Sequence, residues 1–345
     1  MINFVYIITK HFYKTSLNTS VLENNYFFMN YLKSFKILLF ILISTLVIGC
    51  QNSRQVVPVD VDTDKIFEAL QPNDDSNSMD LVFGPQNIPG TIFDTEFTTD
   101  KPEVFIYFQN LTVLDVNPDI TASLLDFVTE ILLENDFITE SDPSPVERWE
   151  EYVNQNIPYN EAAAGVIDSI KQNFETKNSK ESTPDYPCNV YFNIYPVYLD
   201  DNYVTYRHYA YTYTGGAHGI PATYLVTYNL KTGQKLSMGD IVKSGSINEV
   251  REEVVAALAY SYPIYENIST VDQYLDSLNG WLGHFQPLEQ DEKLTINNFP
   301  LPDPAVTSYG LVFIYQMYEI APASEGSPVV LIPYKDLHGC LNIKI

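Results

Sequence analysis

The sequence predicts an α+β fold in which antiparallel sheets pack with helices in two closely associated subdomains. Apolar residues alternate with period two across residues 188–213, while other segments repeat them at helical spacing. Strands and helices also follow one another in blocks and not in strict alternation, which favours α+β over α/β. The 296 residues from Cys50 onward are enough for one large or two small domains. We place the subdomains at residues 91–213 and 214–345.

The first expected subdomain opens with a strand and continues with helices. Glu103–Thr112 is rich in residues that favour strands. Apolar residues then recur at helical spacing after Asp119, which is a candidate N-cap. A second helical region runs from about Val146 to Phe174, with a break expected at Pro158.

The period-two segment predicts a β-hairpin that is followed by a third strand. Apolar and polar residues alternate from residue 188, and Asp200–Asn202 supplies the turn before a second strand, Tyr203–Tyr213. Ala222–Leu230 is expected to be the third strand, and the chain turns again at Lys231–Gly233.

Two capped helices and three strands are expected in the remainder of the chain. Ser246 and Thr270 each begin a capping box that precedes apolar residues at helical spacing. Strands are expected at about Lys293–Phe299, Tyr309–Gln316 and Pro328–Pro333.

A basic and then apolar segment precedes Cys50. Lys33 and Lys36 are followed by the 13 residues Ile37–Gly49, whereas a transmembrane helix needs about 20. A short apolar run after basic residues is typical of a secretory signal. Its ending, Leu46–Cys50, resembles a bacterial lipobox, which implies cleavage before Cys50 and lipidation of this cysteine. The alternative is an uncleaved signal anchor.

The N-terminal region therefore divides into three expected parts. Residues 29–49 are the signal peptide, and Met29 is a natural start, so that residues 1–28 are an extension outside the expected protein. Residues 50–90 are polar and acidic and are expected to form a tether. We expect a membrane-anchored lipoprotein of the bacterial cell envelope, facing the periplasm or the cell exterior and held on the membrane by the lipid on Cys50.

The expected mature chain is strongly acidic. From Cys50 onward it holds 15 Lys and Arg against 43 Asp and Glu, a formal charge of −28. Nucleic acid is excluded as an expected partner, because phosphate binding needs clustered basic residues. Such a charge would attract cationic proteins or ions. The alternative is that the charge serves only solubility.

Motifs of common catalytic and metal chemistry do not occur in the sequence. It has no H-E-x-x-H, G-x-S-x-G or P-loop motif and no Cys-x-x-Cys pair. We therefore expect no metal and no cofactor, and we favour binding over catalysis. Cys188 and Cys340 form either a disulfide in an oxidising compartment or two separate buried thiols.

Tyrosines gather on one face of the expected strand 203–213. Tyr209, Tyr211 and Tyr213 share this face by alternation. There they could stack on sugar rings or anchor a protein interface, because tyrosine combines apolar area with a polar tip. The alternative is that tyrosine simply favours strands.

Two glycines follow this strand. Gly215 and Gly216 can adopt positive φ, which lets the chain turn. His218 then lies in a loop, where ligand-binding residues often occur. It is a candidate ligand-binding or catalytic residue, although a general base would also need an orienting partner.

Two sets of motifs resemble a known family. Tyr213–Gly219 and then Tyr228–Leu236 resemble the opening of domain of unknown function 3298. Gly310–Phe313, Tyr318–Pro322 and Ile332–Tyr334 resemble its closing motif, in the same order and spacing.

Residues from about 95 to 212 resemble a companion, domain of unknown function 4163. The two resemblances imply an α+β fold in envelope proteins. Relatives include the extracellular part of an anti-sigma factor that binds lysozyme, and a wall-associated domain beside a peptidoglycan deacetylase whose catalysis belongs to a separate domain.

These observations lead to three hypotheses. The first is a non-enzymatic envelope protein that binds peptidoglycan, another wall component or a cationic wall-active protein such as lysozyme. The second is a wall-associated hydrolase that uses His218 with Glu319, if the two motifs meet in space; Tyr318 beside Glu319 is then a further ligand-binding candidate. The third is a purely structural envelope module.

Overall fold

The structure, a computed structural model, describes residues 88–98, 102–111, 117–180, 187–262, 268–281, 293–320 and 327–344. The expected extension, signal peptide and Cys50 lie outside these residues, as does the expected tether apart from its last three residues. No helix in the described part of the chain combines the length and apolar character that spanning a membrane requires.

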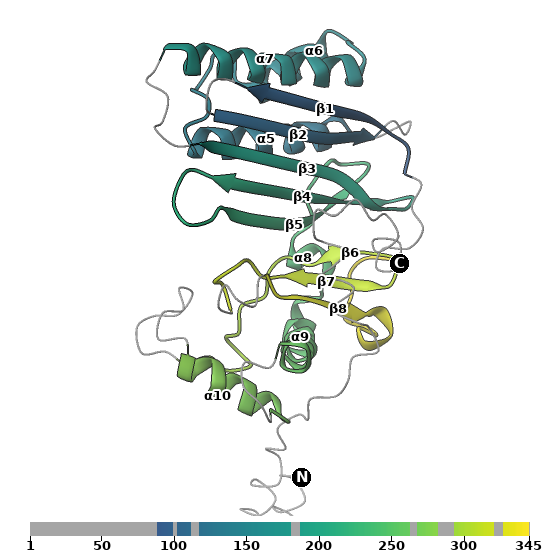
Figure 1. Ribbon diagram of the computed structural model, residues 1–345. Helices are drawn as coiled ribbons and strands as arrows, with labels where there is room; N and C mark the ends of the chain where they lie inside the picture. Colours follow the sequence, from purple (N-terminus) through teal and green to yellow (C-terminus); the bar gives the residue numbers. More distant parts are fainter. Residues whose placement is uncertain are drawn as a thin grey trace, which may run out of the picture. The chain divides into compact units, whose positions relative to one another are not determined.

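A five-stranded sheet with the strand order β1-β2-β3-β4-β5 forms the larger sheet (Figure 1). Its strands are β1 (Gly90–Thr98), β2 (Pro102–Leu111), β3 (Cys188–Leu199), β4 (Tyr203–Tyr213) and β5 (Ile220–Asn229). Three of the four pairs of neighbouring strands are antiparallel as expected, but β2 and β3 pair parallel to each other. The helices between β2 and β3 supply the long crossover that a parallel pair needs. The expected α+β class is confirmed, with a mixed larger sheet.

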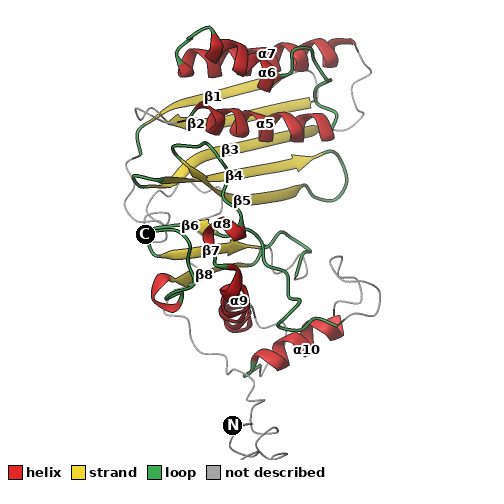
Figure 2. Cartoon of the chain, turned by 180° about the vertical axis from the view of Figure 1, so that it is seen from behind, coloured by secondary structure: helices red, strands yellow, loops and turns green. Residues whose placement is uncertain are grey.

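Three helices cover one face of this sheet. They are α5 (Pro118–Glu134), α6 (Pro145–Asn154) and α7 (Tyr159–Lys180). Helix α5 lies behind the strands in Figure 1 and in front of them in Figure 2. Apolar residues of all three helices share one core cluster with residues of the sheet. The break expected at Pro158 is confirmed, because α6 ends at Asn154 and α7 begins at Tyr159.

The N-cap of α5 differs from the expected one. Asn117 caps the helix, and its side chain accepts a hydrogen bond of 2.9 Å from the backbone N–H of Asp119. Proline at the first helical position suits this arrangement, because its missing N–H would have no partner there. Asp119, the expected cap, lies instead in the first turn.

The expected hairpin is confirmed in β3 and β4. One carboxylate oxygen of Asp200 accepts hydrogen bonds of 2.7 Å from the backbone N–H groups of Asn202 and Tyr203, which fixes the turn. The next strand, β5, pairs with β4 in the same sheet. The subdomain boundary expected between residues 213 and 214 thus falls between two neighbouring strands, and the division remains a prediction.

The smaller sheet has the strand order β6-β7-β8 and packs with the helices that follow β5. Its strands are β6 (Ala305–Val306), β7 (Gly310–Ile314) and β8 (Val329–Pro333), and its helices are α8 (Met238–Ile241), α9 (Ile247–Ser261) and α10 (Val271–Trp281). The two expected helices and the last two expected strands are therefore confirmed.

The prediction of a strand at Lys293–Phe299 is wrong, because this segment contains a turn. The side-chain amide of Asn279 bonds both backbone groups of Leu294, at 2.7 Å to its N–H and 2.9 Å to its C=O. Asn298 then accepts from the N–H of Thr295 at 2.6 Å. Side chains thus replace the strand neighbour that these backbone groups would otherwise need.

Of the two expected capping boxes, neither forms completely. The Ser246 side chain makes no capping hydrogen bond, and Glu249 instead accepts from the Cys340 thiol at 3.3 Å. Thr270 does accept from the N–H of Gln273 at 3.2 Å, but Gln273 reaches back to the N–H of Ser269.

The two sheets are joined through a buried ring of hydrogen bonds. The Thr205 hydroxyl donates to the Val306 carbonyl at 2.6 Å, and the Thr227 hydroxyl accepts from the Val306 N–H at 2.9 Å. The two hydroxyls lie 2.8 Å apart, and since the Thr205 proton is already used, Thr227 is the donor between them. Both backbone groups of Val306 on β6 are therefore satisfied by threonines of β4 and β5.

A buried histidine lies on the helix side of β4. The ring of His208 is 4.8 Å from that of Phe127, and its Nε2 atom is 3.4 Å from the Tyr228 hydroxyl. Burial lowers the pKa of His208 to about 3, and the charge of Lys235 lowers it further. His208 is therefore a neutral core residue at physiological pH.

Candidate functional site

The face of the five-stranded sheet opposite the helices carries rows of aromatic side chains. In one row Tyr107, Asn193 and Tyr209 are cross-strand partners, and in the next row Phe105, Tyr191 and Tyr211 are partners. The rows extend over β2, β3 and β4, and all six side chains except that of Tyr209 are partly exposed. We call these six residues the open face.

Arg207 lies on the same side of β4, next to the open face. Its side chain is fully buried, and its guanidinium carbon is 4.8 Å from the ring centre of Tyr209 and 5.6 Å from that of Tyr195. Burial lowers the pKa of Arg207 and raises the pKa of both tyrosines. This packing fixes the Tyr209 ring, which is only 7% exposed. Within the open face, Tyr209 therefore leaves little of its own surface free for a ligand.

Carboxylates border the open face on its β1 side. Glu96 is the cross-strand partner of Phe105, and Asp94 is the partner of Tyr107, so both point to the same side of the sheet. Glu103 precedes Phe105 by two residues and shares this side. All three carboxylates are exposed. The open face therefore combines aromatic rings with a negative border.

The loop after β4 packs against the edge of the open face. Gly215 and Gly216 have φ values of 99° and 103°, in the left-handed region that favours glycine. The Tyr213 hydroxyl donates to the Gly216 carbonyl at 3.1 Å. Farther on, the Tyr211 ring lies directly over Gly219, where an added Cβ would come within 2.3 Å of the ring. Tyr211 and Tyr213 are thus positioned by the loop that the glycines allow.

The loop after β7 holds Tyr318 and Glu319, the other two candidate site residues of the sequence analysis. Tyr318 has a φ of 69° and is 60% exposed. Glu319 accepts a hydrogen bond of 2.7 Å from the backbone N–H of Gln316. Burial raises the pKa of the Glu319 carboxyl, and this hydrogen bond partly opposes the shift. The last two residues of the motif that begins at Tyr318, residues 321 and 322, lie outside the described residues.

The structure gives His218 and Glu319 different partners. His218 is exposed, and its Nδ1 atom lies 3.1 Å from the Gly219 carbonyl. No hydrogen bond joins His218 to Glu319, both of which are described residues. The base–orienter pair of the hydrolase hypothesis therefore has no support in the hydrogen bonding.

The two cysteines are separate buried thiols. Cys188 belongs to the core cluster of the larger sheet, and Cys340 belongs to the cluster around α9 and the smaller sheet. The alternative of a disulfide between them is therefore incorrect for this structure. Within the described residues, no group of three or more His, Cys, Asp or Glu side chains is placed to hold a metal ion.

Sequence reasoning found the tyrosines of β4 but missed most of the open face. Tyr191 alternates with the apolar residues of β3, and Phe105 and Tyr107 alternate along β2. This alternation was visible, but the parallel pairing of β2 with β3 was not, and it is this pairing that brings the rows together.

Comparison with known proteins identifies two parts of the chain. Residues 240–335 match the family described as "Protein of unknown function (DUF3298)", and residues 138–221 match the family described as "Deacetylase PdaC". The first match extends from α8 through β8, and the second extends from the loop before α6 to the start of β5. No curated protein matches the chain.

Two solved structures of the same family description are similar to the chain. One, a DUF3298 family protein from Pseudomonas aeruginosa PAO1, is 18% identical, with a TM-score of 0.45 over 74% of this chain and 95% of that one. The other, a DUF3298 family member from Bacteroides fragilis NCTC 9343, is 16% identical, with a TM-score of 0.44 over 74% of this chain and 94% of that one. From the match of its residues 240–335, the C-terminal part of this chain is a DUF3298 domain.

Proposed function

We propose that the protein is a lipid-anchored, non-enzymatic protein of the bacterial envelope whose open face binds a cationic wall-active protein, such as lysozyme. The observation that carries this proposal is the combination of partly exposed aromatic rings with the exposed carboxylates of Asp94, Glu96 and Glu103 on one face. The lipid on Cys50 and the division into a 4163-like subdomain and a DUF3298 domain belong to the same proposal. Under it, the deacetylase named in the PdaC match is no activity of this chain.

Physical chemistry favours a basic partner over an anionic one. Arginine and lysine side chains are attracted to the faces of aromatic rings and to carboxylates. The formal charge of −28 expected for the mature chain would also speed the arrival of a cationic protein. Aromatic residues, moreover, are common anchors of protein interfaces. The same charge would repel an acidic polymer.

Binding of lysozyme to the full-length protein tests the proposal. We expect retention on immobilised lysozyme at low salt and a marked loss near 0.5 M salt, where charges are screened. Tyr211→Thr on the open face should weaken binding about tenfold, the effect of a residue worth about 1.4 kcal/mol. Tyr224→Thr is the matched control, because Tyr224 is 41% exposed but lies on the helix side of β5. Equal binding by both variants, or no retention at low salt, would contradict the proposal.

A wall glycan is the second candidate, favoured by Tyr107 and Asn193, where a partly exposed ring suited to stacking on sugars lies beside an amide. Muropeptides serve as its probe in the same experiment. Binding of muropeptides that survives 0.5 M salt and is weakened by Tyr211→Thr, without retention on lysozyme, would select the glycan as the ligand of the open face. For the anchor, incorporation of labelled palmitate should be lost in Cys50→Ala.

A further inference from the structure

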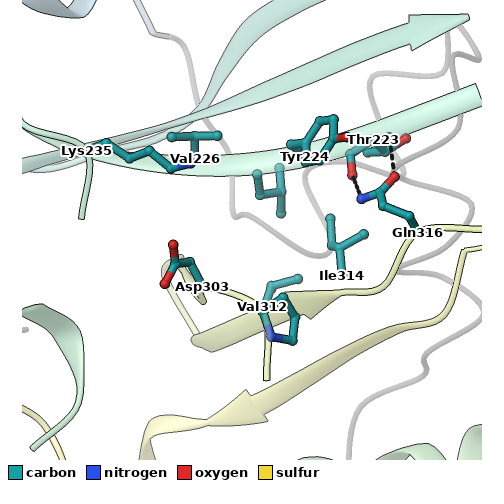
Figure 3. Close-up of a pocket in the computed structure, with 10 residues that line it drawn as sticks. Thr223, Tyr224, Val226, Lys235, Asp303, Val312, Ile314 and Gln316 are labelled. Atoms are coloured by element: carbon teal, nitrogen blue, oxygen red, sulfur yellow. Dashed lines mark hydrogen bonds between the residues drawn. The ribbon is translucent and has the colours of Figure 1, made fainter. Parts of the chain in front are cut away.

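A pocket of about 160 Å³ lies between the outer edge of β5 and the side chains of β7 that face it (Figure 3). Its walls are mostly apolar and include Leu225, Val226, Val312 and Ile314. A cavity of about 150 Å³ admits a molecule the size of benzene. The pocket therefore has room for a ligand group of roughly six heavy atoms.

Gln316 closes one end of the pocket by imitating a neighbouring strand. Its side-chain oxygen accepts from the Thr223 N–H at 3.3 Å, and its side-chain nitrogen donates to the Thr223 carbonyl at 2.8 Å (Figure 3). A paired strand makes the same two hydrogen bonds to an edge residue. Thr223 therefore points its backbone groups away from β4.

The backbone N–H and C=O of Leu225 also point away from β4, at the position of the pocket. Backbone groups of alternate residues point off the same edge of a strand, and the Thr227 carbonyl, two residues farther on, accepts from the Leu236 N–H at 2.8 Å. Leu225 thus presents its N–H and C=O to the pocket. Neither group has a hydrogen-bond partner within the part of the chain that the structure describes, although Leu225 is buried. Buried backbone groups are nearly always paired.

We propose that this pocket binds a secondary amide. The carbonyl of the ligand accepts from the Leu225 N–H, its N–H donates to the Leu225 carbonyl, and a small apolar substituent such as a methyl group packs against Val312 and Ile314. The acetamido group of an amino sugar and the peptide bond of a short peptide share this chemistry. The proposal does not depend on the cationic partner, because the pocket and the open face share no residue.

Charged side chains at the far end of the pocket can bind the remainder of such a ligand. Lys235 and Asp303 line this end (Figure 3). Asp303 is held in place because its carboxylate accepts from the Met238 N–H at 2.7 Å, at the start of α8. A cation and a carboxylate together suit a ligand with both acceptors and donors, such as sugar hydroxyls or peptide termini.

Titration of the full-length protein, labelled with ¹⁵N-leucine, tests the proposal. We expect N-acetylglucosamine or N-acetylalanine methylamide to move the Leu225 amide resonance downfield in a saturable way. Glucose, which has no amide, and N,N-dimethylacetamide, which has no N–H, should have at most a tenth of the affinity. A response to the sugar alone identifies a glycan source, and a response to the peptide alone identifies a peptide source. No saturable response to either, or an equal response to the controls, would overturn the proposal.

A filled pocket provides the second test. Ile314→Phe adds bulk to the pocket wall and should weaken binding of the effective ligand at least tenfold. Ile220→Phe is the matched control, because Ile220 lies on β5 but is 65% exposed and does not line the pocket. Unchanged affinity in folded Ile314→Phe would refute the assignment of the site. If this variant does not fold, the ligand series on the unchanged protein decides.

Discussion

Replacing Thr205 by valine is expected to destabilise the joint between the two sheets. Valine keeps the shape of the side chain but removes the hydroxyl. The Val306 carbonyl then loses its donor and the Thr227 hydroxyl loses its acceptor, at a position where both threonines are almost fully buried. With about 1 kcal/mol for each hydrogen bond, the loss of two costs about 2 kcal/mol of unfolding free energy.

The ring of hydrogen bonds also predicts how two substitutions combine. Thr227→Val removes the bond from the Val306 N–H and the same bond between the hydroxyls, and so also costs about 2 kcal/mol. The double variant removes three bonds and not four, because both single changes break the shared one. It should therefore cost about 3 kcal/mol, which is about 1 kcal/mol less than the sum.

Urea unfolding of the four proteins measures these differences as shifts of the midpoint. Thr223→Val is the control on β5, the strand that also carries Thr227. The hydrogen bonds of Thr223 to Gln316 use its backbone and not its hydroxyl. Its effect should stay within about 0.5 kcal/mol. The reasoning fails if Thr205→Val is equally neutral, or if the two threonine substitutions are strictly additive.

Three further predictions concern buried titratable groups. Because burial lowers the pKa of His208 to about 3 in the folded protein, against about 6.5 when unfolded, only the unfolded chain binds a proton between these values. The stability contributed by neutral His208 is thus present above pH 6.5 and is lost as the pH falls, by about 2 kcal/mol between pH 7 and pH 5. Urea unfolding should show a smaller loss in His208→Gln, and an equal loss would contradict this cause. Lys177 is buried and bonds the carbonyl and carboxylate of Asp136 beyond the end of α5. Lys177→Met should therefore lower the free energy of unfolding by about 1–3 kcal/mol, whereas an unchanged urea midpoint would refute this role. Cys188 and Cys340 are free and buried, and burial raises the pKa of both thiols. Both should react with a thiol reagent only after unfolding, without prior reduction, and fast labelling of the native protein would contradict their burial.

The sequence predicted those elements that are stabilised by interactions between residues close together in the chain. The hairpin of β3 and β4 has alternating apolar residues and a turn carboxylate, Asp200, which bonds the N–H groups that the turn exposes. The strand expected at residues 293–299 failed for the opposite reason. Its backbone partner is the side chain of Asn279 on α10, and no local pattern indicates a contact between those two segments.

Strand β1 was missed because its pattern is only half apolar. Phe93 and Phe97 face the core, whereas Ile92, Asp94 and Glu96, which point to the other side of the strand, are exposed. The segment was placed at the start of the first subdomain, but its alternating carboxylates lowered its content of strand-favouring residues. Asp94 and Glu96 thus weakened the strand pattern in the sequence, and in the structure they supply negative charge beside the open face.

Strand β4 shows why the tyrosine pattern alone could not define a site. Thr205, Arg207, Tyr209, Tyr211 and Tyr213 share one side of the strand by alternation, yet the first two are fully buried and the last two are partly exposed. The difference arises because β6 packs on the Thr205 end of the strand, where Val306 binds the threonine hydroxyls. One side of one strand thus serves packing at one end and exposes rings at the other. Where the change occurs depends on the position of the smaller sheet, so that Tyr211 rather than Tyr209 is the tyrosine whose replacement should affect binding most.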